Sequence, residues 1–258
     1  MRLRRFTLIL VSILTLVTSA CRRDSGDKPV ALSAFCAASV ADAVTDIGGA
    51  FAKRTGHQVL VSRGSSGKLC EQIILGASCD LFLPADEQYL TKLQSAGRLV
   101  ERSFTPLASN RLVIAVREAP LEPWPDVSPL LHDRLGNIAV ANPDHAPAGQ
   151  RAMEALAKSG LKDRLRPRLI FADDVRLCAQ YAASGAVGAA LIYETDAAAF
   201  ADKLHIAYRF LPADHSPIRY LGAICSASPH PALAADFLAF ADSPEARLIW
   251  RSHGFAPP

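Results

Sequence analysis

Two hydrophobic patterns alternate along this chain. Short apolar runs are typical of buried strands, and between them lie stretches in which apolar residues recur with the helical period. In the first such stretch, Val40, Val44, Ile47 and Phe51 share one helix face, and Gly56 follows where a helix commonly ends. The pattern predicts strands at residues 30–35, 58–62, 80–83, 111–116, 137–141, 168–171, 188–192 and 218–225. It predicts helices at residues 39–53, 64–76, 86–96, 148–159, 175–184, 231–240 and 244–250.

The order of these elements predicts an α/β protein. Strand, helix and strand in succession are typical of parallel sheets with crossover helices. The succession runs twice, with an interruption at residues 104–111, so we expect two sheets. A stretch with four prolines at residues 117–129 is expected to be a loop. Ligands of such folds lie beyond the carboxyl ends of the strands, against helix N-termini.

Composition narrows the class of protein further. The chain has 258 residues, of which 50% are hydrophobic and 21% are charged, and this excludes a disordered chain and a small disulfide scaffold. The length fits one or two domains. The sequence contains no GxSxG, Walker, dinucleotide-binding or HExxH motif, so we do not expect an enzyme.

Residues 1–20 have the pattern of a signal peptide. Arg2, Arg4 and Arg5 precede an apolar stretch at 6–17, and small residues follow at 18–20. The apolar stretch is shorter than the roughly 20 residues that span a bilayer. The leader holds three of the 28 basic residues and none of the 25 acidic ones, so the remaining chain is formally neutral. No basic cluster remains that would indicate a nucleic-acid partner.

Cys21 would be the first residue after cleavage at Ala20, and small residues before a cysteine at this point resemble a bacterial lipoprotein signal. A lipid on Cys21 would tether the mature protein to the membrane, with residues 21–28 as a flexible linker. Ordinary secretion, with a free or paired Cys21, is the alternative. The compartment is oxidising in either case, and one sequence does not determine how the other cysteines pair. They are Cys36, Cys70, Cys79, Cys178 and Cys225.

Several predicted helices begin just after a predicted strand, and their first residues are candidates for an anion site. Ser39, Ser66, Ala148 and Val175 lie at four such starts, and Tyr193 ends a strand. Helix starts present unpaired N–H groups and a positive dipole, and serine and tyrosine hydroxyls add donors. The alternatives are N-caps for Ser39 and Ser66, and a locally bonded core tyrosine for Tyr193. The pattern alone supports an α/β protein with an anion site.

Five stretches make the chain similar to a known family. They are 35–44 (FCAASVADAV), 64–73 (GSSGKLCEQI), 76–86 (GASCDLFLPAD), 142–149 (NPDHAPAG), and 173–176 (DDVR) with 190–196 (ALIYETD). In these motifs the chain resembles the periplasmic molybdate-binding proteins of ABC transporters, over about residues 29–256. The resemblance implies a two-lobed solute-binding (type II) fold, each lobe a sheet flanked by helices, with a ligand cleft between the lobes. The lobes that we expect are 29–108 plus 217–258, and 109–216.

The same resemblance implies a role for each candidate residue. Ser39 and Ser66 would each give a hydroxyl and an N–H to a tetrahedral oxyanion. Ala148 and Val175 would give an N–H, and Tyr193 its phenolic O–H. A site of donors alone suits a fully deprotonated dianion and disfavours hydrogenphosphate, whose proton needs an acceptor. We therefore expect a monomer without a cofactor that captures molybdate, and also tungstate, for import through an ATPase-driven membrane permease.

A few residues near the ligand motifs depart from the family's pattern: Cys36, Cys70, Cys79, Cys178 and Gly67, the last in place of a third hydroxyl. The cysteines raise an alternative, a periplasmic sensor on the same scaffold that binds a soft metal or metalloid through thiolates. Convergence of several cysteines in the fold would favour the sensor. His145, next to the predicted ligand loop, is expected to pack or hydrogen-bond locally.

Overall fold

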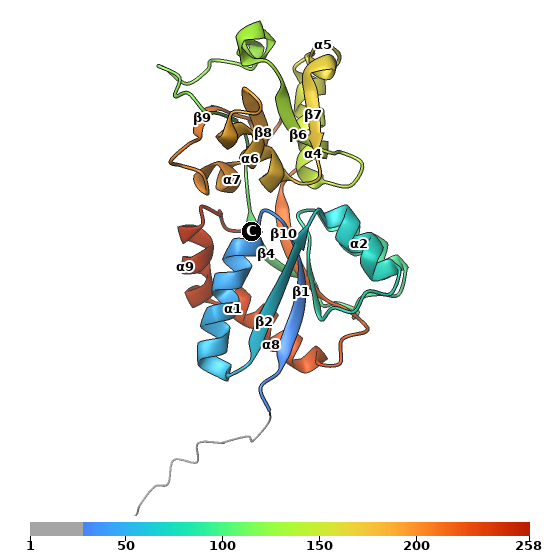
Figure 1. The fold of residues 1–258 in the computed structure, drawn as a ribbon. Helices are drawn as coiled ribbons and strands as arrows, with labels where there is room; N and C mark the ends of the chain where they lie inside the picture. Colours follow the sequence, from blue (N-terminus) through green and yellow to red (C-terminus); the bar gives the residue numbers. More distant parts are fainter. Residues whose placement is uncertain (1–27) are drawn as a thin grey trace, which may run out of the picture.

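Two five-stranded sheets with helices on their faces organise residues 28–258, the part of the chain that this computed structural model describes (Figure 1). The predicted signal peptide at 1–20 and Cys21 lie outside the described residues. Each sheet with its helices forms one lobe, and the lobes are stacked along the long axis of the molecule (Figure 1). This is the two-lobed α/β fold that the sequence predicts. Among the described residues, no helix is long and apolar enough to cross a membrane.

The first lobe is built on the strands β1 (Ala31–Ala37), β2 (Gln58–Gly64), β3 (Leu81–Leu83), β4 (Thr105–Ser109) and β10 (Arg219–Ile224). Their order in the sheet is β2-β1-β3-β10-β4. β1 runs parallel to β2 and β3, and β10 is antiparallel to both of its neighbours. The helices of this lobe are α1 (Ala41–Thr55), α2 (Ser66–Ile74), α3 (Glu87–Ser95), α8 (Pro231–Ala241) and α9 (Pro244–Ser252).

The second lobe is built on β5 (Leu112–Val116), β6 (Ile138–Ala141), β7 (Leu169–Ala172), β8 (Ala189–Tyr193) and β9 (His205–Arg209). Their order is β7-β6-β8-β5-β9, with β6 parallel to β7 and β8, and β5 antiparallel to β8 and β9. The helices are α4 (Pro147–Lys158), α5 (Lys162–Leu165), α6 (Val175–Ser184) and α7 (Glu194–Ala198). Short 3-10 turns lie at Ser128–Leu131, Asp133–Leu135 and Arg166–Arg168.

The chain passes between the two sheets twice. It leaves the first sheet at the end of β4 and enters the second at β5, through Asn110 and Arg111. It returns between β9 and β10, through residues 210–218. The lobe boundaries that we predict, 29–108 plus 217–258 and 109–216, stay a prediction, because they depend on which segments move together as rigid bodies.

The hydrophobic pattern does not predict β4, β9, α7 or the four-residue helix α5. β4 and β9 lie at the edges of their sheets, so each is only partly buried and no continuous apolar run marks it. α7 has only five residues and follows β8 directly. The helix predicted at 39–53 begins at Ala41, because residues 38–40 form a turn.

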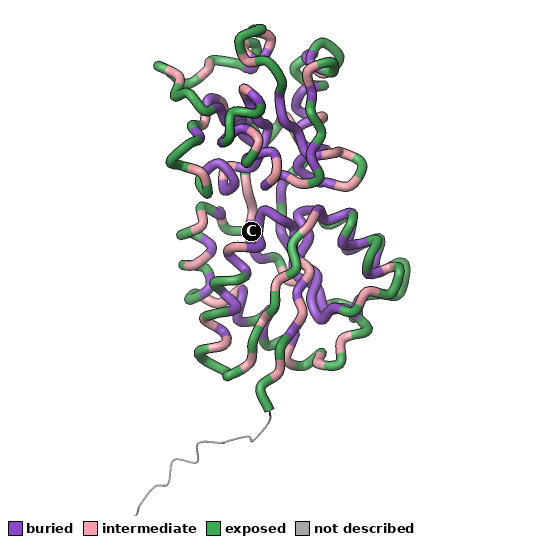
Figure 2. Tube along the Cα trace, in the orientation of Figure 1, coloured by how far each residue is buried: buried purple, intermediate pink, exposed green. Residues whose placement is uncertain are grey.

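Buried residues lie on the strands and on the helices next to them in both lobes (Figure 2), and the apolar ones among them pack into hydrophobic cores. In α1, Val44, Ile47 and Phe51 are buried, as the helical period predicts, and Gly56 ends the helix with a left-handed φ of 81°. The ring of Phe51 packs edge-on against Phe237 of α8, with the ring centroids 5.4 Å apart. This packing fixes α1 with its N-terminus directed towards the second lobe (Figure 1).

Gly149, in the first turn of α4, lets this helix approach the end of β6. A Cβ at this position would lie 1.9 Å from the carbonyl oxygen of Ala141 and 2.9 Å from the backbone nitrogen of Pro143. Both contacts are with backbone, which cannot rotate away as a side chain can. The absence of a side chain at Gly149 therefore sets the position of the α4 N-terminus relative to β6.

Replacing Gly149 by Ala is expected to lower the free energy of unfolding by about 1–3 kcal/mol, because the backbone around Ala141 has to move. Gly49→Ala is the matched control, since Gly49 lies within α1 and a Cβ there would have no atom within 4 Å. This control should stabilise the protein by about 0.5–1 kcal/mol. Chemical denaturation measures both changes, and equal effects of the two substitutions would contradict the close-packing argument.

Candidate anion-binding site

A small cavity lies between the two lobes. Its walls come from the turn after β1, the start of α2, the loop before α4, the start of α6 and the end of β8. The cavity is small, with a volume of about 20 Å³. All of the predicted ligand residues line it, and all are buried: Ser39, Ser66, Ala148, Val175 and Tyr193.

The hydroxyl of Ser39 is oriented by a chain of hydrogen bonds that begins in the crossing segment. Asn110 Nδ2 donates to the Tyr220 hydroxyl at 3.1 Å, and the Tyr220 hydroxyl donates to Ser39 Oγ at 3.0 Å. Because Ser39 Oγ accepts this bond, its own hydrogen is free to donate into the cavity. Ser39 does not cap α1, since the residue in the N-cap position is Val40.

Ser66, the first residue of α2, is held in a similar way. Its Oγ accepts a hydrogen bond from the backbone N–H of Ala85 at 3.0 Å, so its hydroxyl hydrogen is also free for the cavity. The neighbouring Ser65 instead places its Oγ 2.9 Å from Nδ1 of His145 in the second lobe. Burial, together with nearby Lys68, lowers the pKa of His145, so a neutral ring shares this bond at pH 7. We expect a local hydrogen bond for His145. The structure instead shows a bond to Ser65 that joins the two lobes.

Among the backbone N–H groups at the cavity, four from the predicted ligand residues have no hydrogen-bond acceptor within residues 28–258. They belong to Ser39, Ser66, Ala148 and Val175. The last three lie in the first turns of α2, α4 and α6, where N–H groups lack intrahelical partners and the helix dipole is positive. A buried N–H without an acceptor is costly, so these groups together indicate a position for an anion.

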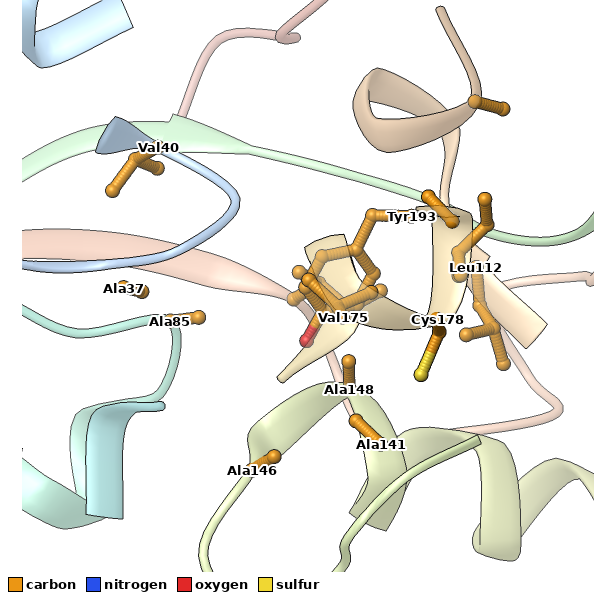
Figure 3. Packing of buried hydrophobic residues seen from close by; sticks show 14 of the residues in the cluster. Ala37, Val40, Ala85, Leu112, Ala141, Ala146, Ala148, Val175, Cys178 and Tyr193 are labelled. Atoms are coloured by element: carbon orange, nitrogen blue, oxygen red, sulfur yellow. The ribbon is translucent and has the colours of Figure 1, made fainter. Parts of the chain in front are cut away.

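Tyr193, at the end of β8, adds a side-chain donor. Its side chain is 1% exposed, and its hydroxyl has no hydrogen-bond partner among the described residues. Burial, with Tyr220 nearby, raises the pKa of Tyr193 well above its usual range, so the hydroxyl stays protonated and able to donate. Figure 3 shows the ring beside Val175 and Ala148. The alternative of a locally bonded core tyrosine does not apply.

The cavity relies on neutral donors. Within the described part of the chain, no lysine or arginine lines it, and the one acidic residue in its wall is Asp174. This carboxylate caps α6, because its Oδ1 accepts a hydrogen bond from the backbone N–H of Leu177 at 2.9 Å. The positive end of the α6 dipole therefore opposes the charge of Asp174.

Ion pairs join the lobes around the cavity. Arg151 of α4 pairs with Asp86, and both side chains are about nine-tenths buried. Asp86 also caps α3, since its Oδ1 accepts from the backbone N–H of Gln88. At a solvent-exposed edge between the lobes, Lys68 of α2 lies 2.8 Å from Asp173 of the second lobe. These pairs connect the lobes in the closed arrangement that the structure shows.

Arg176 makes a third connection. One nitrogen of its guanidinium lies 3.0 Å from a carboxylate oxygen of Asp42 in α1, and another lies 3.2 Å from Asp196 in α7. Asp196 is fully buried, and burial raises its pKa to about 7, although Arg176 opposes this shift. Arg176 is thus shared between one carboxyl group from each lobe.

Gly67 brings the two lobes into backbone contact. Its N–H donates to the carbonyl oxygen of His145 at 2.8 Å, and a Cβ at Gly67 would lie 2.6 Å from that oxygen. In the sequence, Gly67 stands where the family's pattern has a residue that could give a third hydroxyl. The structure adds a steric reason, because no side chain fits between α2 and His145 when the lobes are closed.

Sequence analysis identifies residues that line the cavity but misses those that support them. Tyr220 lies 181 positions from Ser39 in the sequence, and Arg151 lies 65 positions from Asp86, so no local pattern connects either pair. The only available signal is chemical. Tyr220 and Arg151 are themselves buried in the fold, and a buried polar group needs a partner.

The cysteines do not form a metal site within residues 28–258. The five in this range are all buried, and no group of three or more histidine, cysteine or acidic side chains in it is placed to hold a metal ion. The sensor alternative would be favoured by convergence of several cysteines. The described residues bring only Cys79 and Cys225 into contact.

A two-lobed fold with a cavity of donors between the lobes defines a solute-binding protein. The chain belongs to the bacterial extracellular solute-binding protein family, whose profile matches residues 32–256. Family membership confirms the predicted resemblance and fold class. It also confirms that the chain is a binding protein and not an enzyme.

Several known proteins are similar to the chain over most of its length. The molybdate-binding protein ModA of Escherichia coli (strain K12) is 30% identical over 233 residues, which are 87% of this chain and 88% of that protein. YvgL of Bacillus subtilis (strain 168), which its name assigns to the ABC transporter substrate-binding lipoproteins, is 32% identical over 89% of this chain and 87% of its own. The periplasmic molybdate-binding protein of Azotobacter vinelandii has a similar structure, with a TM-score of 0.80 and 28% identity, over 88% of this chain and 99% of that one.

Replacing Asp86 by Asn is expected to favour the open arrangement of the lobes. Asparagine keeps the cap on α3, but the guanidinium of Arg151 loses its buried carboxylate and keeps only the partly exposed Glu154 at 2.8 Å, and opening returns that charge to water. The closed state should lose roughly 3 kcal/mol. Small-angle X-ray scattering should then give a larger radius of gyration than for the wild type.

The matched control is Asp242→Asn, which breaks an exposed ion pair with Arg247 at 2.9 Å. An exposed pair contributes less than about 1 kcal/mol, so this variant should scatter and unfold like the wild type. An Asp86→Asn protein as compact and as stable as this control would contradict the role assigned to the buried pair.

Proposed function

We propose that the protein captures molybdate in the periplasm and delivers it to the membrane permease of an ABC importer. The observation that carries the proposal is the gathering of unpartnered donors on one small cavity that has no basic side chain in its described wall. The proposed ligand residues are Ser39, Ser66, Ala148, Val175 and Tyr193. Similarity to proteins named molybdate-binding, over nearly their whole length, supports the choice of oxyanion.

The ligand chemistry follows from the donors. A fully deprotonated tetrahedral dianion has only acceptors, and a site of N–H and O–H groups satisfies it completely. Hydrogenphosphate carries a proton that such a site leaves unmatched, so it is disfavoured. Sulfate has only acceptors and must be rejected by size. Tungstate has nearly the size and charge of molybdate, so we propose that it binds as well.

Delivery follows from the placement of the donors on both lobes. Ser39 and Ser66 belong to the first lobe and Tyr193 to the second, so the anion favours the closed state. We propose that the protein acts as a monomer and that its closed form docks on the permease. We further propose a lipid on Cys21, a proposal supported by the similarity to a protein named a lipoprotein. In this proposal, the lobes 29–108 plus 217–258 and 109–216 are the bodies that move relative to each other when the protein opens and closes.

Calorimetric titration of residues 22–258 with molybdate, tungstate, sulfate and phosphate at equal ionic strength tests the function. We expect one-to-one binding of molybdate and tungstate, with no heat of binding for the other two anions. Absence of binding with all four would overturn the proposal. Tight binding of phosphate would contradict the argument that the N–H and O–H donors select the anion.

Replacing Tyr193 by Phe should weaken molybdate binding by about 1.5–3 kcal/mol, the usual contribution of a hydrogen bond to a charged group. The ring and its packing stay, and only the donor is lost. Tyr208→Phe is the control, since Tyr208 packs against Phe210 in the second lobe and does not line the cavity. A dissociation constant that is the same in both variants and the wild type would remove Tyr193 from the site.

A further inference from the structure

Two of the buried cysteines that do not line the ligand cavity lie in contact with each other. The Sγ atoms of Cys79 and Cys225 are 2.9 Å apart, and each residue is 2% exposed. Cys79 lies in the loop between α2 and β3, and Cys225 directly follows β10. Both belong to a separate small core of the first lobe, together with Leu69, Phe82 and Leu90.

The backbone holds these two residues side by side. The N–H of Cys225 donates to the carbonyl oxygen of Asp80 at 2.9 Å, and Ile224 pairs with Leu81 in the antiparallel ladder between β10 and β3. Cys225 also forms an isolated bridge with Leu99 on its other side. The contact between the thiols is therefore a consequence of strand pairing and does not depend on the conformation of a free loop.

The other described cysteines have different surroundings. Cys36 Sγ contacts the carbonyl oxygen of Ala34 at 3.8 Å, and Cys70 Sγ contacts that of Tyr89 at 3.8 Å. Cys178 Sγ contacts the carbonyl oxygen of Asp174, within its own helix, at 3.3 Å. Within residues 28–258, Cys79 and Cys225 are thus the pair positioned for a covalent bond.

We propose that Cys79 and Cys225 form a disulfide in the exported protein. The family is extracellular, and such compartments allow disulfides to persist. The oxidant is a protein or small-molecule disulfide. The thiolate of one cysteine attacks a sulfur of this donor, which releases one donor thiol and leaves a mixed disulfide. The second cysteine then attacks the first, the Cys79–Cys225 bond forms, and the other donor thiol leaves. The donor takes up two electrons and the two thiol protons.

The bond forms before the first lobe is fully packed. In the folded chain, the hydrogen bond with Cys79 and burial raise the pKa of Cys225 far above its usual range, so few thiolates are available. The same burial protects the finished bond from reductants. Oxidation is therefore expected during folding in the periplasm and is slow when a reduced, folded protein meets an oxidant later.

The bond would tie the returning strand to the first lobe without linking the two lobes. Cys79 and Cys225 lie 146 positions apart, and the segment between them contains the whole second sheet. Both sulfur atoms belong to the first lobe, so lobe closure and the ligand cavity stay free to operate. A long closed loop of this kind gives a large entropic stabilisation of the folded chain.

Peptide mass mapping of the full chain, exported with its own leader by a Gram-negative host, tests the proposal. The protein is alkylated in denaturant without reductant and then digested. We expect one linked peptide pair that contains Cys79 and Cys225, lighter by two hydrogen atoms than the two free peptides, and alkylated Cys36, Cys70 and Cys178. Full alkylation of Cys79 and Cys225, or a link from either to another cysteine, would overturn the proposal.

Thermal unfolding gives a second measurement. Reduction in denaturant, followed by refolding with reductant present, should lower the melting temperature of the wild type by about 10 °C and leave a Cys79→Ser/Cys225→Ser double variant unchanged. Cys70→Ser is the matched control, since Cys70 lies in the same small core but its thiol donates to the Tyr89 carbonyl and not to a cysteine, and this variant should keep the sensitivity to reductant. If the double variant does not fold, the peptide mass map of the wild type still decides whether the disulfide forms. Equal melting temperatures of the wild type with and without reductant would contradict the bond.

Discussion

Closing the two lobes buries hydrogen-bond donors against one another, and only an acceptor placed between them can satisfy these donors. Ser39 and Ser66 approach from the first lobe, and Ala148, Val175 and Tyr193 approach from the second. Each buried donor that stays unpaired costs about 1–3 kcal/mol. The free energy of closure and the free energy of ligand binding are therefore linked. The turns and helix starts that carry the donors, and the contacts between the edges of the lobes, act together through this link.

The placement of charge supports the proposed selectivity of the cavity. The basic side chains nearest to the lobe interface are already paired with protein carboxylates, as Arg151 is with Asp86 and Arg176 is with Asp42 and Asp196. A free ammonium or guanidinium in the cavity would attract any small anion. Fixed N–H and O–H groups instead distinguish anions by shape and by the protons they carry. The absence of basic side chains from the described wall of the cavity and the pairing of the nearby arginines thus act together.

The sequence predicts the parts of this molecule that local patterns can encode. The period of Val44, Ile47 and Phe51 predicts α1, and the motif residues Ser66 and Ala148 predict two helix starts at the cavity. The edge strands β4 and β9 leave no such pattern, because each is only partly buried. The supporting groups Tyr220 and Arg151 are missed for another reason, since their partners are distant in sequence and only the tertiary fold brings them together.

Asn110 connects the crossing segment to both lobes. Its Nδ2 donates to the Tyr220 hydroxyl, which in turn orients Ser39, and it also donates to Thr195 Oγ1 at 2.8 Å in the second lobe. Separation of the lobes pulls this one amide in two directions, so a motion of the crossing segment disturbs a ligand donor that it does not touch. A transporter could then make the protein release its anion by bending the crossing alone, without any group of its own reaching into the cavity.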